Sequence, residues 1–413
     1  MNKPDIRFNG FDGEWVEKKL GDCLCKSISN GIMNRPGINE LKVKHINVVN
    51  MYAEDKIHIN DLTYFLATEE DIKKCDVQVG DIFITRSSIK AEGIAQANVL
   101  LDKSNLVFDD HLMQLRFSKS FNPEFLKELL RSKSVRRQFI LKGKTTTMTT
   151  IGQGEISSTD IFFPSPAEQT KIGNLFFQID SLISSTQKEH DKLVSLKKCM
   201  LQKMFPKKGC LVPEIRFEGF SGDWEEKKIS DLATIFIGLV TTMTKYYSNQ
   251  GTLLIRNSDI KDNYFSFSDN PIYLNQEFAD QNSSRKHKIG DVITVHTGDV
   301  GTSAVITEKE EGTIGFATIV TRPKTNLLDS MFLSIFLNSD AHKIWAVSVS
   351  TGDGRTNYNL GDYTQLLLKI PSLPEQQKIG SYFQNLDNLI SKQSAELEKL
   401  KNVKKTLLSK MFV

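Results

Sequence analysis

Hydrophobic residues in two long segments, 167–205 and 374–412, recur at alternating spacings of three and four residues. This spacing places them on one side of an α-helix, so each segment is predicted to be a long amphipathic helix. The stripes also follow a seven-residue register, which is the period of a coiled coil. The apolar positions on the two stripes are Ile172, Phe176, Ile179, Ile183, Leu193 and Met200 in the first segment and Ile379, Phe383, Leu386, Ile390, Leu397, Leu400 and Leu407 in the second.

Each predicted helix needs a partner, because an isolated helix with an exposed apolar stripe is marginal in water. The other helix is the economical partner, since both stripes have the same length and pattern. A helix of about 38 residues would be roughly 57 Å long, enough for a strut between two modules. Thr186 and Gln393 occupy the same polar place in the two registers, where they either fix the pairing register or are merely tolerated near solvent. Glu168 and Glu375 follow a proline at the start of each helix, so we expect them to stabilise the helix N-terminus and not to act as catalytic acids.

The chain repeats itself. PDIRFNGFDGEWVEKK begins at Pro4, and the near copy PEIRFEGFSGDWEEKK begins at Pro213. Residues 163–205 align without a gap with residues 370–412, whereas the stretches between these blocks barely agree. The pattern is either an old duplication kept for stability or two modules that perform one task on two different targets. The second interpretation explains why the middles differ while the ends stay alike.

The divergent stretches mix strand and helix signals. VGDIFITRSS (79–88) and IGDVITVHTG (289–298) each predict a Gly-Asp turn followed by a β-strand, and residues 121–140 and 327–347 each predict a helix. The whole is therefore an α+β protein with an internal repeat. We expect five parts: a first module (1–163), a first constant helix (164–206), a linker (207–212), a second module (213–370) and a second constant helix (371–413).

Polar and basic side chains gather in the predicted turns of both modules. They follow the Gly-Asp strand and the late helix of each module, and they are of the types that contact phosphates and base edges in DNA. Any one of them is more simply a solvated loop residue, but their recurrence at equivalent places favours a shared role. The candidates are Thr85, Arg86, Ser87, Ser88, Lys90, Lys142, Lys144 and Thr145 in the first module and His296, Thr297, Arg355, Thr356 and Asn357 in the second.

Composition narrows the class of protein. The chain has 413 residues with a net charge of +3, which is mild for a lone nucleic-acid binder and predicts that basic charge is local or shared with another subunit. No apolar run is long enough for a membrane span, and five irregularly spaced cysteines suit reduced thiols in a cytoplasm. Phosphate-loop, dinucleotide, zinc-binding and nucleophile-elbow motifs are incomplete or missing, so we expect no metal site and no catalytic residue in this chain.

Taken together, these motifs resemble one known family over essentially the whole chain. The P-[DE]-I-R-F-x-G-F-x-G-x-W segments, the Gly-Asp strands and the P-x-x-EQ-x-KIG helices that end in K-M-F occur in the same order as in the specificity subunit of type I restriction-modification systems. Each motif alone would be weak, but the combination is specific.

The resemblance implies a function and a set of partners. Each module would be a target recognition domain that reads one half of a bipartite, asymmetric DNA sequence. The constant helices would pack antiparallel as a coiled coil, set the gap between the half-sites and dock two methyltransferase subunits. Those subunits would use S-adenosylmethionine to methylate adenine N6, and two restriction subunits would use ATP and Mg²⁺ for cleavage. The specificity subunit itself would be a non-catalytic bacterial cytoplasmic protein without a bound cofactor.

Two other functions stay open on the residues alone. A coiled-coil adaptor that joins two proteins would explain the helices, but not the paired basic turns. An enzyme with duplicated catalytic domains would require a shared polar constellation in both modules, and none is evident in the sequence.

Overall fold

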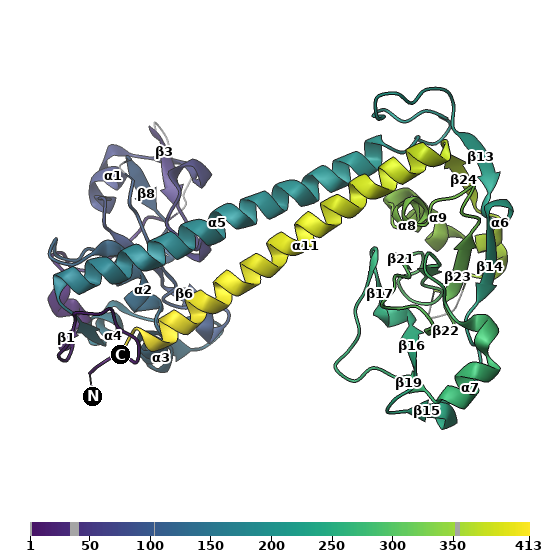
Figure 1. Cartoon of the computed structure of the whole chain (residues 1–413). Helices are drawn as coiled ribbons and strands as arrows, with labels where there is room; N and C mark the ends of the chain where they lie inside the picture. Colours follow the sequence, from purple (N-terminus) through teal and green to yellow (C-terminus); the bar gives the residue numbers. More distant parts are fainter. Residues whose placement is uncertain (1, 34–40, 103, 352–355) are drawn as a thin grey trace. The chain divides into compact units, whose positions relative to one another are not determined.

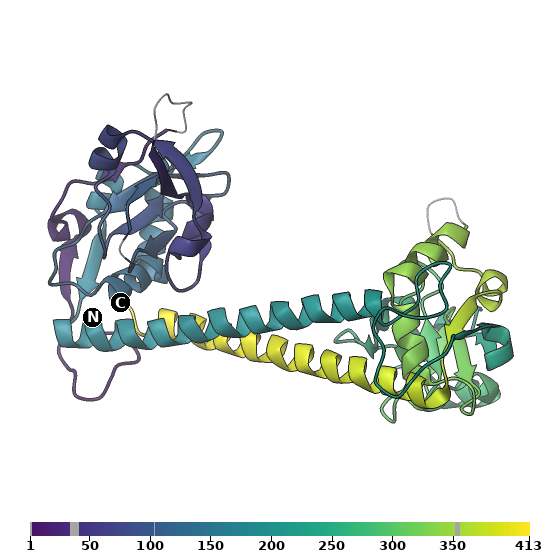
Figure 2. The same cartoon turned by 90° about the horizontal axis from the view of Figure 1, so that it is seen from above.

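A computed structural model describes residues 2–33, 41–102, 104–351 and 356–413 of the chain. The contacts within the chain divide it into two compact units. Unit 1 consists of Met1–His190 with Gln393–Val413, and unit 2 consists of Asp191–Lys392. Both chain termini therefore lie in unit 1, where Figures 1 and 2 show them close together. Each unit contains one globular module and one segment of each long helix.

Unit 1 is built from short strands and helices followed by one long helix. Its strands are β1 (Val16–Lys19), β2 (Ser29–Asn30), β3 (Leu41–Ile46), β4 (Thr63–Ala67), β5 (Ile82–Thr85), β6 (Ser87–Ser88), β7 (Ala97–Val99), β8 (Leu106–Phe108), β9 (Leu112–Leu115), β10 (Lys144–Thr145), β11 (Thr149–Thr150) and β12 (Asp160–Phe163). Its helices are α1 (Glu69–Cys75), α2 (Pro123–Arg131), α3 (Lys133–Lys142), α4 (Gln153–Ser157) and the first part of α5 (Pro166–Lys203). The sheets have the orders β2-β9-β5-β7, β4-β3-β8, β10-β11-β6 and β1-β12.

Unit 2 follows the same plan with different lengths. Its strands are β13 (Glu225–Lys228), β14 (Ala233–Ile237), β15 (Tyr247–Ser248), β16 (Thr252–Arg256), β17 (Ile260–Lys261), β18 (Tyr264–Phe265), β19 (Tyr273–Leu274), β20 (Val292–Thr294), β21 (Ser303–Val305), β22 (Ile314–Phe316), β23 (Ile319–Pro323) and β24 (Leu367–Ile370). Its helices are α6 (Ile229–Leu232), α7 (Gln276–Gln281), α8 (Ser330–Leu337), α9 (Asp340–Val349), α10 (Leu360–Thr364) and the first part of α11 (Leu373–Lys410). In both units an antiparallel sheet carries the Gly-Asp strand at its centre, and a parallel pair, β3 with β8 or β16 with β22, lies in a second sheet. The mixed α and β fold and the two long helices confirm the predicted fold class.

The helix expected at the end of each module is in fact two helices. In unit 1 the chain breaks at Ser132, whose backbone is extended and ends α2 before α3 begins. In unit 2 the break lies between α8 and α9, where the Ser339 side chain accepts a hydrogen bond from the His342 N–H. A side chain that bonds its own backbone competes with the helical hydrogen bonds, which explains why apolar periodicity alone missed the break.

The Gly-Asp signal marks the start of a β-strand, as the sequence predicts, and the structure shows that this strand is fully buried inside its sheet. Gly80 has φ +92°, a value that favours glycine, and Asp81 next to it accepts the Gln78 N–H at 2.7 Å. The Asp81 carboxylate also pairs with Arg116 at 2.7 Å. Gly290, Asp291 and Arg322 repeat this arrangement in unit 2, with φ +86° and an ion pair of 2.7 Å.

Each module encloses the end of the long helix that follows the other module. Figure 1 shows the yellow end of α11 beside α3 in unit 1. There the Phe412 ring packs with its centroid 6.1 Å from Trp15, 5.6 Å from Phe125 and 5.7 Å from Phe176. In unit 2 the end of α5 does the same through Phe205, whose centroid lies 6.0 Å from Trp224, 5.5 Å from Phe332 and 6.4 Å from Phe383. The repeated K-M-F ending and the repeated tryptophan therefore belong to one aromatic cluster in each unit.

The N-terminal part of each long helix is tied to its own module by three repeated residues. Glu168 is buried and accepts two hydrogen bonds of 2.7 Å from the Arg7 guanidinium. Gln169 accepts the N–H of Asn122 at 3.3 Å, and a Cβ on Gly173 would lie 2.4 Å from the Asn122 Oδ1. The expected role of Glu168 at the helix N-terminus was incomplete, since its carboxylate holds a distant arginine.

The same three contacts recur in unit 2 with other residue numbers. Glu375 pairs with Arg216 at 2.7 and 2.8 Å, Gln376 accepts the Asp329 N–H at 3.0 Å, and Gly380 approaches the Asp329 Oδ1. The near-identical sequence blocks thus encode one helix-to-module junction that is built twice.

The apolar stripes contribute to the module cores as well as to helix pairing. Ile172 and Phe176 belong to the core of unit 1, whereas Ile379 and Phe383 belong to the core of unit 2. None of the thirteen stripe residues predicted from the sequence is exposed. Within each unit the two helix segments run antiparallel. In unit 1 Phe176 meets Phe412 and Asp180 meets Lys404, and in unit 2 Phe383 meets Phe205 and Asp387 meets Lys197. No helix among the described residues combines the length and hydrophobicity that crossing a membrane requires.

Candidate nucleic-acid interface and helix surfaces

The turn after β5 and the turn after α3 come together in unit 1. Ser87 lies opposite Thr150 and Ser88 opposite Thr149, so β6 and β11 form an antiparallel pair. Strand β10 joins the other edge of β11, and Thr145 lies opposite Thr149. One small three-stranded sheet therefore carries four of the eight candidates that the sequence predicts for this module in two separate segments.

Several of these side chains point outward and are available to a ligand. Arg86 and Lys90 are exposed at the two ends of β6, and Ser87 and Ser88 between them are half-buried. Lys144 is 80% exposed although it pairs with Glu155 at 3.1 Å. Such a surface ion pair contributes little to stability, so Lys144 can exchange Glu155 for a phosphate at low cost.

Thr85 and Lys142 are committed to bonds inside the module. The buried Thr85 hydroxyl donates to the Gly93 carbonyl at 2.7 Å and accepts the Gln96 N–H at 2.9 Å. The Lys142 ammonium donates to the hydroxyls of Ser158 and Thr159 at 3.1 Å, and burial lowers the Lys142 pKa. We therefore leave both residues out of the interface and assign them to its support.

The equivalent turns of unit 2 also meet. Thr297 and Asn357 form an antiparallel bridge, and the Thr297 hydroxyl donates to the Asn357 Oδ1 at 2.9 Å. Backbone hydrogen bonds from Gly298 to Thr356 and from Tyr358 to His296 hold the two segments together. Arg355, the remaining candidate of this group, lies outside the described residues.

His296 is a neutral hydrogen-bonding group at this site. Burial lowers its pKa, so the imidazole is uncharged near neutral pH. Its Nδ1 lies 2.8 Å from the Thr297 Oγ1, whose own proton goes to Asn357. The Nδ1 must therefore be the protonated nitrogen, and the Nε2 is an acceptor. The site offers this acceptor together with the Asn357 amide, a group that pairs bidentately with adenine.

Sequence reasoning missed some residues of both sites. Thr149 and Thr150 supply the central strand of the unit 1 sheet, and the run TTTMTT was a usable signal for it. Asn257 accepts the His296 N–H at 2.8 Å, but nothing in the sequence connects these residues. Ile89, whose side chain is 84% exposed, stands between Ser88 and Lys90 as an apolar group that could contact a base.

Asp109, Asp110 and His111 are grouped closely enough to hold a cation, next to Arg86. Their ligand atoms all lie within 4.8 Å of one another. The His111 Nδ1 lies 2.7 Å from Asp109 and 3.1 Å from Asp110, so the three side chains satisfy one another. We assign no metal to them.

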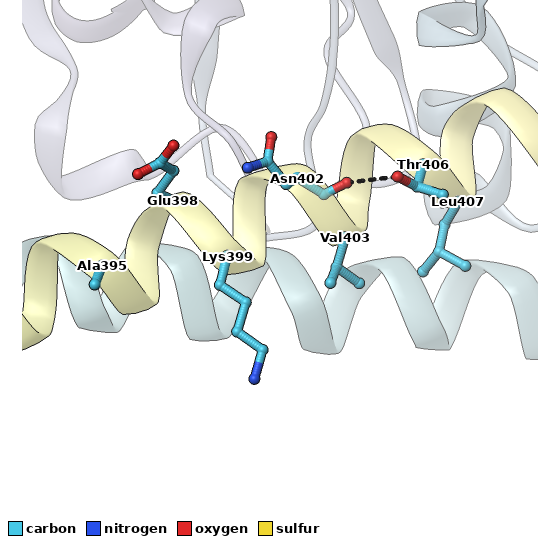
Figure 3. A pocket seen from close by; sticks show the side chains of 7 residues that line it. All are labelled: Ala395, Glu398, Lys399, Asn402, Val403, Thr406 and Leu407. Carbon is cyan, nitrogen blue, oxygen red and sulfur yellow. Dashed lines mark hydrogen bonds between the residues drawn. The ribbon is translucent and has the colours of Figure 1, made fainter. Parts of the chain in front are cut away.

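Both long helices expose apolar residues at equivalent positions. Leu182 and Val403 are 46% and 41% exposed in unit 1, and their repeat equivalents Leu389 and Leu196 are 48% and 39% exposed in unit 2. In unit 1 a shallow groove of about 560 Å³ follows α11 beside Val403. Figure 3 shows Lys399, Val403 and Leu407 projecting to one side of the helix and Glu398 to the other. These exposed apolar positions therefore occur twice, once in each unit.

Comparisons with known proteins agree with this organisation. The family model described as "Type I restriction modification DNA specificity domain" matches residues 12–194 and 221–402. The chain is 27% identical over 203 residues to the type I restriction enzyme EcoKI specificity subunit of Escherichia coli K12, a match that covers 46% of this chain and 42% of that protein. It is 21% identical over 343 residues to the MjaVIII specificity subunit of Methanocaldococcus jannaschii, covering 80% of this chain and 75% of that protein.

The fold matches a solved structure over its full length. The crystal structure of a type I restriction-modification system S subunit from M. genitalium covers 100% of this chain and 99% of its own, with a TM-score of 0.59 and 14% sequence identity. At this identity the match concerns the fold alone.

Proposed function

Because the chain belongs to the type I restriction-modification DNA specificity family, we propose that it reads a bipartite DNA target with one half-site for each module. In unit 1 the reading surface is the sheet of β6, β10 and β11 with Arg86, Lys90 and Lys144. In unit 2 it is the bridge of Thr297 and Asn357 with His296 and Thr356. The main support for this proposal is that each surface forms where the segment after the Gly-Asp strand meets the segment after the late helices, in both units.

The two half-sites should differ in sequence. The unit 1 surface offers cations and hydroxyls, whereas the described unit 2 surface offers a neutral imidazole and an amide. Arginine and lysine favour guanine, while asparagine favours adenine. Two modules with such different side chains favour an asymmetric target.

The long helices would set the gap between the half-sites and dock two methyltransferase subunits. The duplicated apolar positions Leu182 with Val403 and Leu389 with Leu196 support two equivalent docking surfaces. The methyltransferase subunits would transfer the methyl group of S-adenosylmethionine to adenine N6, and two restriction subunits would add ATP- and Mg²⁺-dependent cleavage. This chain would supply recognition and no catalytic group.

A methylation map tests the proposal directly. The chain is expressed with a cognate methyltransferase subunit in a host that lacks adenine methylation, and N6-methyladenine is mapped by single-molecule sequencing. We expect one two-part motif with an unread gap of fixed length, methylated once on each strand. A matched strain without this chain should show no such motif.

Lengthening both helices by one heptad separates reading from spacing. We expect a longer gap with unchanged half-sites, because the reading surfaces lie outside the helices. Altered half-sites would contradict the assignment of the modules, and an assembled complex without methylation would contradict the reading function itself.

A further inference from the structure

Unit 1 has a basic groove next to its reading surface. The groove has a volume of about 1020 Å³ and lies between Tyr52, the start of α3 and the last turns of α11. Its basic lining residues are Arg131, Lys133, Lys401, Lys404 and Lys405, against the single acidic residue Glu54. Such an excess of positive charge in a concave surface attracts a polyanion.

Two of the five cations are structural. Arg131 donates hydrogen bonds to the carbonyl oxygens of Ala97, Glu54 and Ala53 at 2.8 to 2.9 Å. Lys404 is buried and pairs with Asp180 at 2.6 Å and with Glu54 at 3.1 Å. These bonds also occupy Glu54, the one acidic group of the groove.

The other three cations are uncommitted. Lys133, Lys401 and Lys405 are exposed, and none of them forms an ion pair or a side-chain hydrogen bond with a residue that the structure describes. Asn402, Thr406 and Ser409 line the same groove. Amide and hydroxyl groups together with lysine are the usual partners of phosphate oxygens in DNA complexes.

The groove continues into the proposed reading surface. The short helix Ala91–Gly93 follows β6, and Gly93 packs so closely that a Cβ there would lie 2.0 Å from the Ser88 Oγ and 3.5 Å from the Tyr52 hydroxyl. Tyr52 is itself part of the groove lining. A duplex that contacts Ser88 and Lys90 can therefore place its adjoining backbone along Tyr52 into the groove.

The repeat does not reproduce this charge in unit 2. Of the three uncommitted lysines, Lys133 and Lys401 are replaced by Asp340 and Val194 in unit 2, and Lys405 keeps a lysine, Lys198. The extra charge is a property of unit 1 and not of the shared scaffold.

We propose that the backbone phosphates adjoining the first half-site bind in this groove through Lys133, Lys401 and Lys405. The inference rests on the proposed function, since it assumes that unit 1 reads DNA. It adds that the two halves of the target are held unequally, with a longer phosphate contact on the side of unit 1.

The test compares the full chain with the triple variant Lys133→Gln, Lys401→Gln, Lys405→Gln in equilibrium DNA binding over a range of salt concentrations. The slope of log K against log [salt] should fall by about 2 to 3, since each phosphate contact contributes about 0.9. At 0.15 M salt the affinity should drop on the order of a hundredfold, equally for target and non-target duplexes. The matched control replaces Lys188, Lys192 and Lys392, which are exposed on the same two helices outside the groove.

The outcomes separate the two proposals. If the wild-type chain binds its mapped target and the groove variant keeps the same slope, the groove proposal is wrong and an acidic protein segment becomes the better occupant. An equal slope change in the control variant would also overturn it, because general charge would then explain the effect. If the wild-type chain shows no preference for its target, the reading function fails, whatever the groove does. Equal melting temperatures of the variants would show that folding is unaffected.

Discussion

The two units build the same junction between helix and module around different buried polar groups. In unit 1 the repeat-related pair Asp180 and Lys404 is buried, with side-chain exposures of 0% and 8%, and α2 adds Lys127 and Glu128 to it. In unit 2 the equivalent pair Asp387 and Lys197 is 26% and 20% exposed. There α8 contributes the neutral Ser334, which bonds to Asn263, and Asn263 in turn bonds to Asp387.

The difference shows how a constant helix accommodates two divergent modules. The aspartate and the lysine on the long helices are the same in both units, whereas the groups that surround them come from the modules and differ. Unit 1 buries four charges that must all be paired, since an unpaired buried charge costs several kcal/mol. Unit 2 buries two neutral histidines, His287 and His342, at 1% and 2% exposure, whereas unit 1 buries one, His45, at 8%. We therefore expect the two units to unfold under different conditions.

Acidification should unfold unit 2 first. Burial lowers the pKa of both His287 and His342 to about 4. In the unfolded chain a histidine takes up its proton near pH 6.5, whereas in the folded chain these two histidines stay neutral until about pH 4. Each histidine therefore lowers the free energy of unfolding by about 3 kcal/mol as the pH falls from 6.5 toward 4. The His287 Nδ1 is 2.9 Å from Thr313, and its Nε2 has no partner among the described residues, so a proton there finds no acceptor.

Two measurements at pH 7 and pH 4.5 test this effect. Urea titrations give the free energy of unfolding, and amide hydrogen exchange gives the protection of α8 in unit 2 and of α2 in unit 1. We expect a large loss of protection in α8 and a smaller one in α2. The variant His287→Leu, His342→Leu should lose most of the difference between the two pH values. If α2 loses protection first, the assignment of acid sensitivity to unit 2 is wrong.

Removing the cation of the helix should damage unit 1 more than unit 2. Lys404→Met leaves the buried Asp180 with Lys127 as its remaining paired cation, a lysine that Asp180 shares with Glu128. Breaking a buried pair costs about 3–5 kcal/mol. Lys197→Met removes a partly exposed partner of Asp387, but Asp387 keeps its hydrogen bond from Asn263. This variant should therefore lose about 1 kcal/mol of stability. Denaturant midpoints of the two variants give the comparison, and similar losses would mean that burial does not distinguish the two pairs.

Replacing the helix glycine should test the tightness of each junction. A Cβ on Gly173 would lie 2.4 Å from the Asn122 Oδ1 and 2.9 Å from the Phe125 N, whereas on Gly380 the nearest atom is 2.9 Å away. Overpacking of this kind costs about 1–3 kcal/mol, so Gly173→Ala should destabilise unit 1 by more than Gly380→Ala destabilises unit 2. Thermal melting checks the order. Gly154→Ala, at a position with nothing within 4 Å of the new Cβ, is the control.

The sequence predicted the parts of the fold that depend on local pattern. Both long helices and the two Gly-Asp strands follow from periodicity and turn residues, and the structure confirms them. Strand order was out of reach, because pairs such as β3 with β8 join segments that no local signal connects. The role of Glu168 was missed for the same reason, since its partner Arg7 lies far away in the sequence.

The candidate site was predictable in position but not residue by residue. Recurrence of polar turns in both modules identified segments that the structure does bring together. The direction of Thr85 was not predictable, because β5 is buried on both faces and alternation therefore carries no information. The sequence predicts Lys142 to be an exposed surface lysine, but its ammonium donates hydrogen bonds to two hydroxyls, those of Ser158 and Thr159.

The smallest expected effect concerns single base positions. Asn357→Ala should relax the preference at one position of one half-site by about 1–3 kcal/mol, because a bidentate amide contact is lost. Arg86→Ala should relax the base preference at one position of the half-site that unit 1 reads and leave the half-site that unit 2 reads unchanged. Methylation maps of both variants measure the two preferences, with Lys90→Ala expected to weaken binding to all sequences alike if it contacts phosphate. A change in both half-sites from Asn357→Ala alone would mean that the modules do not read independently, and the comparison of two separate readers would have to be abandoned.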